Sequence, residues 1–465
     1  MIHSSAMKHS CTRRQMVRSL VSGSILLPGI LQSLLAENAT EIQDPNPLAP
    51  RKPHFSAKAK RVIFLFMPGG VSHMDSFDHK PRLFADAGKP VSSKNPNGPK
   101  FVRPLWDFKP RGNCGMEVSE LFPSIAGIAD DICLVRSMRG LHNDHFQATL
   151  GIHTGSVSVP RPSIGSWASY GLGTENQNLP SFVVLAPELP YAGSQVWGSD
   201  FLPGCHQGTR VQPGEEPIPN LVPKVPSRKI QELELGLLDR FNRKHQQKRP
   251  TDPALASRIK SFETAFGMQM EMPEVLDLSK ESDATLKLYG LERGATKGFA
   301  WQCLVARRMA ERGVRFIELI DVGSHSNWDA HADMKTHEPL ARNVDQAIAG
   351  LIMDLKSRGM LDDTLVVWTT EFGRTASADG AKGRGHQHSA FSSWMAGGGV
   401  KGGFVYGKTD DYGMRIAENP VTVHDFHATI QHLLGFDHEK LTFRHAGRDF
   451  RLTDVHGEVI KALLA

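Results

Sequence analysis

The stretch Val366–Gly399, VVWTTEFGRTASADGAKGRGHQHSAFSSWMAGGG, carries the pattern from which the fold is best predicted. The segment Leu365–Trp368 is short, apolar and β-branched, which is typical of a strand buried on both faces of a parallel sheet. Glu371 follows this strand, and His386 and His388 lie within seventeen residues of Glu371. Ligands of open α/β sheets bind at the carboxyl ends of strands. The stretch therefore predicts a site with carboxylate and imidazole groups at a sheet edge.

Strand-like and helix-like segments alternate on both sides of this stretch. The clearest predicted helix, Glu338–Ser357, has its apolar residues on one face, and Gly359 follows its end. Such alternation predicts parallel strands joined by crossover helices. We therefore predict an α/β fold, a doubly wound and mostly parallel sheet flanked by helices. The predicted strands are Val62–Met67, Ile132–Val135, Ser181–Ala186, Val314–Leu319, Thr364–Thr369 and Phe391–Ala396.

A middle region, roughly residues 187–300, departs from this alternation. It is rich in proline and glycine up to Pro226, and two charged helical stretches follow at Ser227–Gln247 and Ala254–Met270. We interpret it as a helical insertion that serves as a structural cap or a subunit contact. The oligomeric state is not predicted.

The N-terminus resembles an export signal of the twin-arginine type. Thr12–Met16 reads TRRQM, an apolar segment Leu20–Leu35 follows, and no acidic residue precedes Glu37. The apolar segment is too short to span a bilayer comfortably. We predict a signal peptide over residues 1–39, a proline-rich linker over 40–60 and one domain over 61–465. The mature protein is expected to be periplasmic or otherwise extracytoplasmic, without a transmembrane segment.

The charge and the cysteines exclude some classes of function. The predicted signal contains Lys8, Arg13, Arg14 and Arg18 but only one acidic residue, Glu37, so the mature chain is close to neutral and no nucleic-acid partner is expected. The four cysteines after the signal have no CxxC spacing, so we do not predict them to bind metal. They allow up to two disulfides, whose pairing the sequence does not determine, although Cys133 and Cys303 lie in apolar runs typical of buried thiols.

Two polar clusters follow predicted strands in the first third of the chain. In GGVSHMDSFDHKP, Gly69–Pro81, the glycines let the backbone approach a ligand, so Gly69, Gly70 and Ser72 are candidates for anion binding. In LHNDHFQATLGIHTG, Leu141–Gly155, polar groups gather at a helix start, where backbone amides favour anions. Its candidate groups are His142, Asp144, His145 and His153, of which Asp144 has the alternative role of a helix cap.

Two further clusters offer metal ligands. In GSHSNWDAHADMKTH, Gly323–His337, the pair Asp329 and His331 supplies the mixed oxygen and nitrogen ligands that suit zinc or manganese. The opening stretch adds Glu371, His386 and His388 as ligand candidates. Its Arg374 has two alternative roles, to hold a phosphate or sulfate or to neutralise Glu371. We interpret the clusters together as one metal-assisted site. His325 and His337 are weaker candidates.

These residues also carry a resemblance to a known family. From about Arg61 to the C-terminus the chain resembles the exported bacterial family named domain of unknown function 1501, of the alkaline phosphatase and sulfatase superfamily. The resemblance implies the superfamily's sheet with a metal site at the strand ends, and it implies no particular substrate. The matching segments are MPGGVSHMDSFDHKP, RPSIGSWASYGLGTENQNLPSFVVL, NWDAHADM, LDDTLVVWTTEFGRT, WMAGGGVKGGFVYGKTDDYG and HAGRDFRLTDVHG.

The resemblance extends to individual site residues. Asp329 and His331 resemble the carboxylate and histidine that hold one metal, and His386 resembles a later histidine ligand. Glu371 and Phe372 occupy the place of an Asp-His pair, so this resemblance implies a carboxylate without its neighbouring imidazole.

Other positions of the chain depart from the superfamily pattern. Gly385 stands where an aspartate is expected, and His388 is the candidate to compensate for it. Pro68 replaces the first metal-binding aspartate, and Asp75 is the candidate substitute. His145 occupies the place of the sulfatase nucleophile.

Three hypotheses follow for the function. In the favoured one, the protein is a metal-dependent hydrolase of phosphate or sulfate esters, including those of saccharides. Asp329, His331, Glu371 and His386 hold the metal, and a metal-activated water or His145 attacks. His142 and Arg374 complete the catalytic candidates. In the second, an inactive relative binds an anionic saccharide or a partner protein, and in the third Ser72 acts as the nucleophile of a serine hydrolase.

Overall fold

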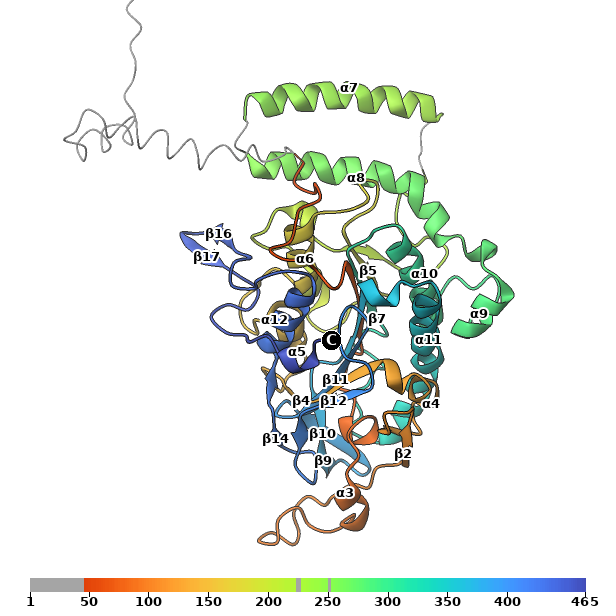
Figure 1. The fold of residues 1–465 in the computed structure, drawn as a ribbon, viewed down its shortest axis with the longest axis vertical. Coiled ribbons are helices and arrows are strands. Elements are labelled where there is room, and N and C mark those ends of the chain that lie inside the picture. Colours follow the sequence, from red (N-terminus) through yellow and green to blue (C-terminus); the bar gives the residue numbers. More distant parts are fainter. Residues whose placement is uncertain (1–45, 223–226, 250–251) are drawn as a thin grey trace, which may run out of the picture. The chain divides into compact units, whose positions relative to one another are not determined.

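A nine-stranded sheet is the centre of the computed structural model, which describes residues 46–222, 227–249 and 252–465 (Figure 1). The strand order is β12-β4-β11-β8-β1-β7-β5-β6, and β15 pairs with β4 outside this path. The strands are β1 (Arg61–Phe66), β4 (Ile132–Arg139), β5 (Phe182–Leu185), β6 (Thr209–Val211), β7 (Phe316–Ile320), β8 (Thr364–Thr369), β11 (Phe391–Ala396), β12 (Phe404–Tyr406) and β15 (Val421–Thr422).

Helices cover both faces of this sheet. On β1, Ile63 and Leu65 face the side of α10 and α11, whereas Phe64 and Phe66 face the side of α5, α6 and α12. Figure 1 shows these two groups of helices on opposite sides of the strands. The prediction of a mostly parallel sheet flanked by helices is therefore confirmed. The helices are α5 (His145–Thr154), α6 (Ile164–Leu172), α10 (Phe299–Glu311), α11 (His337–Ser357) and α12 (Val423–Leu433).

The strand directions bring several loops to one edge of the sheet. β1 pairs in parallel with both β7 and β8. β11 runs antiparallel to β8 and to β4, so β4 points in the same direction as β8. The loops after β1, β4, β7 and β8 therefore start at the same edge, where β11 also begins. β11 differs from the expected parallel strand because a hairpin, β9 (Gly373–Asp379) and β10 (Gly383–Gln387), connects it to β8 in place of a crossover helix.

The middle region contains two long helices, α7 (Arg228–Gln247) and α8 (Pro253–Leu276), as the sequence predicted. However, β6 also lies within residues 187–300 and pairs with β5, so the sheet extends into this region. On α7, the side chains of Leu233, Leu237 and Phe241 are each more than half exposed, so this face is not part of the core. Among the described residues, no helix has the length and apolar character needed to cross a membrane.

The predicted signal peptide, residues 1–39, and Cys11 lie outside the described residues. The described end of the predicted linker packs on the domain, because Arg51 N donates to the Leu172 carbonyl and Lys58 N to the Leu433 carbonyl, both at 2.9 Å. The four described cysteines are not in disulfides. Cys133 and Cys303 are buried, as predicted, and burial raises the pKa of Cys133 to about 12.

A buried polar pair fixes α5 to the sheet. His153 Nε2 lies 2.8 Å from Glu318 Oε1 on β7, and both side chains are almost fully buried. His153 Nδ1 bonds the Thr149 carbonyl at 2.7 Å. Because α5 begins with His145, this pair also controls the position of the helix at the sheet edge.

We predict that Glu318→Ala lowers the free energy of unfolding by about 3–5 kcal/mol, because it leaves a buried imidazole without its partner. Glu318→Gln keeps an acceptor and should cost less. Chemical denaturation followed by circular dichroism measures both. Glu120→Ala, which removes an exposed ion pair with Lys109, is the control and should change nothing measurable. Equal stabilities of Glu318→Ala and the control would contradict the prediction.

Candidate functional site

Three loops of the sheet edge bring histidines around the Asp329 carboxylate. His145, Asp329 and His386 each place one ligand-type atom within 4.8 Å of the other two. Asp329 Oδ1 lies 2.9 Å from His331 Nε2 and 3.3 Å from His386 Nε2. Asp329 Oδ2 lies 3.3 Å from His145 Nε2. We call these four residues the Asp329 cluster. It contains three of the four groups that the sequence analysis expected to converge, and adds His145.

Each imidazole of the cluster is oriented by an acceptor on its outer nitrogen. His145 Nδ1 lies 2.6 Å from Glu371 Oε1, and His331 Nδ1 lies 2.6 Å from Asp379 Oδ2. His386 Nδ1 donates to the Asn143 carbonyl at 2.8 Å. With these outer nitrogens protonated, all three Nε2 atoms turn lone pairs toward Asp329. Such outer contacts are typical of histidines that bind metal.

Glu371, predicted as a metal ligand, lies behind His145 instead of beside Asp329. Its Oε1 accepts from Gly69 N at 2.8 Å as well as contacting His145, and its Oε2 lies 3.1 Å from Thr370 Oγ1, which shares its one proton between this oxygen and the Met67 carbonyl. The side chain is buried. Its contacts therefore assign it to orienting His145, because both oxygens are already occupied.

Arg374 is buried and pairs with Asp329. Its Nη2 lies 2.6 Å from Asp329 Oδ1 and also contacts the carbonyls of Gly69 and Trp328, while Nε and Nη1 donate to the carbonyls of Gly70 and Arg384. Of the two alternatives for this residue, the neutralising role fits, although the carboxylate in contact is Asp329 and not Glu371. The guanidinium has no free face for an external phosphate or sulfate.

The loop after β1 is occupied by internal contacts. Gly69 N donates to Glu371, and Ser72 N donates to His337 Nε2 at 3.2 Å. Ser72 Oγ donates to Asp75 Oδ2 at 2.5 Å, and Asp75 pairs with Arg384 at 2.8 Å. The structure therefore brings neither Asp75 to the Asp329 cluster nor a free Ser72 hydroxyl to a substrate.

The two glycines of this loop have a packing role. A Cβ atom at Gly69, where φ is +111°, would lie 2.6 Å from Trp328 N and 2.7 Å from Asp329 N. A Cβ atom at Gly70 would lie 2.8 Å from the Phe372 ring. Glycine at these positions allows the loops that carry Asp329 and Phe372 to approach closely. The predicted anion cradle at Gly69 is filled by the Glu371 carboxylate.

His142 and His388 lie at the rim of the cluster, and neither reaches Asp329. His388 Nδ1 and its backbone N bond Asn143 Oδ1 at 3.0 and 2.9 Å, while His142 Nδ1 accepts from Asp144 N at 3.0 Å. Burial lowers the pKa of His388, and the nearby charges of Arg139 and His142 lower it further. Asn143 therefore connects the rim to His386 in the cluster.

The remaining histidine and aspartate candidates have structural roles. Asp144 caps α5 by accepting from Phe146 N at 3.0 Å, which is the alternative considered for it. His153 pairs with Glu318 in the core, and His337 is buried against the Trp328 ring. His325 is exposed.

The charges of the cluster support one another. Burial lowers the pKa of the His145 imidazole, but the Asp329 and Glu371 carboxylates outweigh this effect and raise it to about 9. Burial also raises the pKa of Asp329, but His145, His386 and Arg374 hold it well below its ordinary value. Asp329 is therefore ionised at neutral pH.

The donor set fits a divalent cation. His331 Nε2 and His386 Nε2 lie only 2.8 Å apart, a contact that needs a shared proton or cation. His145 Nε2 is buried without an aligned hydrogen-bond partner. Three imidazole nitrogens and one carboxylate form the mixed ligand set that suits zinc.

Sequence reasoning missed three residues of the site. Asp379 and Asn143 orient His331 and His386, and the Tyr191 ring stacks on His145 with centroids 4.3 Å apart. Asp379 ends β9 beside a glycine and resembles an ordinary turn residue. Asn143 acts through its backbone carbonyl, which no residue type reveals, and Tyr191 comes from the proline-rich middle region.

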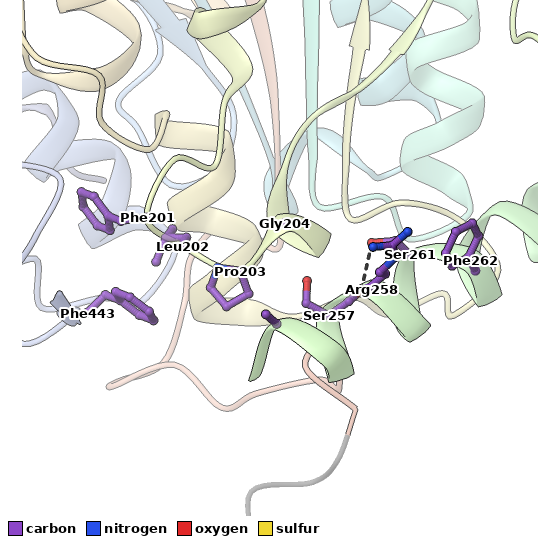
Figure 2. Close-up of a pocket in the computed structure, with 10 residues that line it drawn as sticks. Phe201, Leu202, Pro203, Gly204, Ser257, Arg258, Ser261, Phe262 and Phe443 are labelled. Carbon is purple, nitrogen blue, oxygen red and sulfur yellow. Dashed lines mark hydrogen bonds between the residues drawn. The ribbon is translucent and has the colours of Figure 1, made fainter. Parts of the chain in front are cut away.

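A separate hollow of about 500 Å³ lies away from the cluster (Figure 2). Figure 2 shows Phe201 and Phe443 on one side of it and Phe262 of α8 on the other. None of its lining residues belongs to the Asp329 cluster.

Solved structures similar to this chain include a sulfatase and an alkaline phosphatase. A sulfatase from Pseudoalteromonas sp. shares 13% identity over 84% of this chain and 69% of its own, with a TM-score of 0.35. The alkaline phosphatase from the Antarctic bacterium TAB5 shares 11% over 74% and 92%, with a TM-score of 0.31. An alkaline phosphatase superfamily protein from Vibrio parahaemolyticus shares 11% over 87% and 74%, with a TM-score of 0.36.

The family is settled by a longer match. No curated protein sequence matches the chain. Residues 59–464, however, match the family described as "Protein of unknown function (DUF1501)". The match includes every residue of the Asp329 cluster and every strand of the sheet. The chain therefore belongs to the DUF1501 family, as its motifs predicted.

Proposed function

We propose that the chain is a metal-dependent hydrolase of phosphate or sulfate esters, including esters of saccharides, that acts outside the cytoplasm after twin-arginine export. The observation that carries the proposal is the orientation of three imidazoles, each with its outer Nδ1 held by an acceptor and its Nε2 directed at the Asp329 carboxylate. This arrangement is costly to build in a protein that does not use it, since it places four polar groups together at a partly buried position.

Zinc or manganese would be held by Asp329, His145, His331 and His386. When bound, such a cation lowers the pKa of a bound water to about 7 and polarises an ester oxygen. Glu371 and Asp379 fix the tautomers of His145 and His331, and Arg374 keeps Asp329 ionised. The rings of Tyr191 and Phe372 pack on the His145 ring, with centroids 4.3 and 4.7 Å from its centroid, and shield it from water.

Water is the attacking group that the contacts support. Ser72 donates to Asp75, and Thr370 Oγ1 donates to the Met67 carbonyl at 2.8 Å, so neither hydroxyl is free. Both nitrogens of His145 face carboxylates, which leaves no lone pair for attack on an ester. A water oxygen therefore forms the new bond to phosphorus or sulfur, and the alcohol leaves with a proton from that water.

A second candidate function is binding of an anionic saccharide without hydrolysis. It is favoured by one observation, that His145 occupies the place of the sulfatase nucleophile and forms ion pairs with Asp329 and Glu371. A protonated His145 would supply a positive charge between these two carboxylates without any metal ion. Metal content separates the two candidates.

We predict that the purified protein binds one zinc or manganese ion per chain, and that Asp329→Ala and His145→Ala abolish this binding because each removes a ligand atom. Asp379→Asn and Glu371→Gln should weaken affinity by about 10–100-fold, because they loosen the orientation of His331 and His145. Metal analysis after dialysis and competition with a chelator measure both effects. His325→Ala, an exposed histidine of the same loop, is the matched control. A protein without metal, or a loss in the control, would exclude this site.

We predict that zinc affinity rises about tenfold per pH unit between pH 7 and about 9 and then levels off. The reason is that the raised pKa of His145, about 9 in the metal-free protein, makes a proton compete with the cation below that pH. Chelator competition at several pH values measures the slope. In Glu371→Gln, which removes one of the two carboxylates that raise this pKa, the plateau should begin at lower pH. A pH-independent affinity would show that His145 is not a ligand.

We predict that the zinc-loaded protein hydrolyses aryl phosphates or aryl sulfates and that Asp329→Ala abolishes the reaction, whereas His325→Ala leaves it unchanged. Release of the coloured phenol measures the rate, and Ser72→Ala tests the serine hydrolase hypothesis in the same assay. If the metal-loaded protein turns over neither class of ester, the binding function replaces hydrolysis as the better account.

A further inference from the structure

The charges of the metal-loaded Asp329 cluster and of the side chains that contact it sum to zero. With neutral histidines, which metal binding requires, the negative groups are Asp329, Glu371 and Asp379. Arg374 and the two charges of a divalent cation balance them. A phosphate or sulfate monoester keeps at least one negative charge, so its binding needs a positive group from outside the cluster.

Arg139 occupies the right place for this role. It is the last residue of β4 and therefore lies at the same sheet edge as the cluster. The next residue, Gly140, donates its N–H to the His388 carbonyl at 2.7 Å, and a Cβ on Gly140 would lie 3.3 Å from the Glu371 carbonyl. The backbone that carries Arg139 is thus held directly against the loop that forms the site.

The guanidinium of Arg139 is also available. The side chain is exposed, and among the described residues it forms no hydrogen bond and no ion pair. In contrast, Arg374 and Arg384 are buried and bound to carboxylates. A guanidinium presents its donors as a planar fork that matches two oxygens of a phosphate or sulfate.

Two imidazoles lie beside Arg139. His388 is held by Asn143, whose backbone carbonyl in turn accepts from His386 of the cluster. His142 lies in the loop between Arg139 and Asn143 and is exposed. The end of β4 and the short loop after it thus supply Arg139, His142 and Asn143, the residue that connects the rim to the metal ligands.

We propose that Arg139, with His142 beside it, forms an anion-binding subsite that receives the non-bridging oxygens of a phosphate or sulfate monoester while the ester is presented to the Asp329 cluster; His388 holds Asn143 at its edge. This subsite rests on the proposed hydrolase function, and it takes the role that the sequence analysis considered for Arg374. The shared chemistry of its ligand is a tetrahedral oxyanion.

The test compares Arg139→Ala and Arg139→Lys with the wild type, all loaded with zinc. Calorimetry with inorganic phosphate and with inorganic sulfate measures binding, and aryl phosphate and aryl sulfate measure kcat and KM. Arg139→Ala should weaken binding of the preferred anion and raise KM by about tenfold to hundredfold, as expected for the loss of charged hydrogen bonds. Arg139→Lys should restore part of the loss, and the zinc content should not change.

Lys382→Ala is the matched control, because Lys382 is an exposed cation beside the loop that carries His331, where its backbone N–H donates to the Ala332 carbonyl at 3.2 Å. It should bind the anion as the wild type does. Three results would overturn the subsite. The wild type and Arg139→Ala bind the anion equally, the wild type binds no anion, or only Lys382→Ala loses binding. Anion binding that depends on Arg139 without turnover of either ester would support the subsite and refute hydrolysis.

Discussion

One buried guanidinium, that of Arg374, connects the loops on which the site depends. It donates to carbonyls of the loop after β1 at Gly69 and Gly70, and to Trp328 in the loop after β7. Its charge is balanced by the adjacent Asp329 carboxylate. A buried cation without its counter-ion is strongly destabilising. The position of Asp329 is therefore fixed by the same interaction that holds the loops together, before any ligand binds.

The sheet explains why these loops meet. Parallel pairing of β1 with β7 and β8 directs three carboxyl ends to one edge, and the antiparallel β11 brings β4 into the same direction. The hairpin β9–β10 that precedes β11 folds back at this edge and carries His386. Because this hairpin folds back before the antiparallel strand β11, Glu371 before β9 and His386 on β10 lie within one site.

The strands and the places of the polar residues after them could be predicted from the sequence. Which side chains contact one another could not. The bounds of β8 and β11 coincide with the predicted strands, because β8 is built on the apolar run Leu365–Trp368 and β11 ends in the apolar run Trp394–Ala396. Convergence of Asp329, His331 and His386 also followed from their places after strands. The roles of Glu371 and Arg374 did not, since burial and the direction of each side chain depend on contacts with Gly69 and His145 from distant parts of the chain.

Two departures from the superfamily pattern compensate each other in the structure. Phe372 stands where the resemblance implies a histidine, and His145 stands where it implies a nucleophile. The two rings lie 4.7 Å apart, so His145 brings an imidazole close to the position that Phe372 leaves without one. Glu371, the carboxylate that stays in place, contacts the incoming imidazole directly. In the proposed hydrolase, an exchange of this kind would keep a set of metal ligands and give up a covalent nucleophile. Direct attack by water is the chemistry that such a site would support.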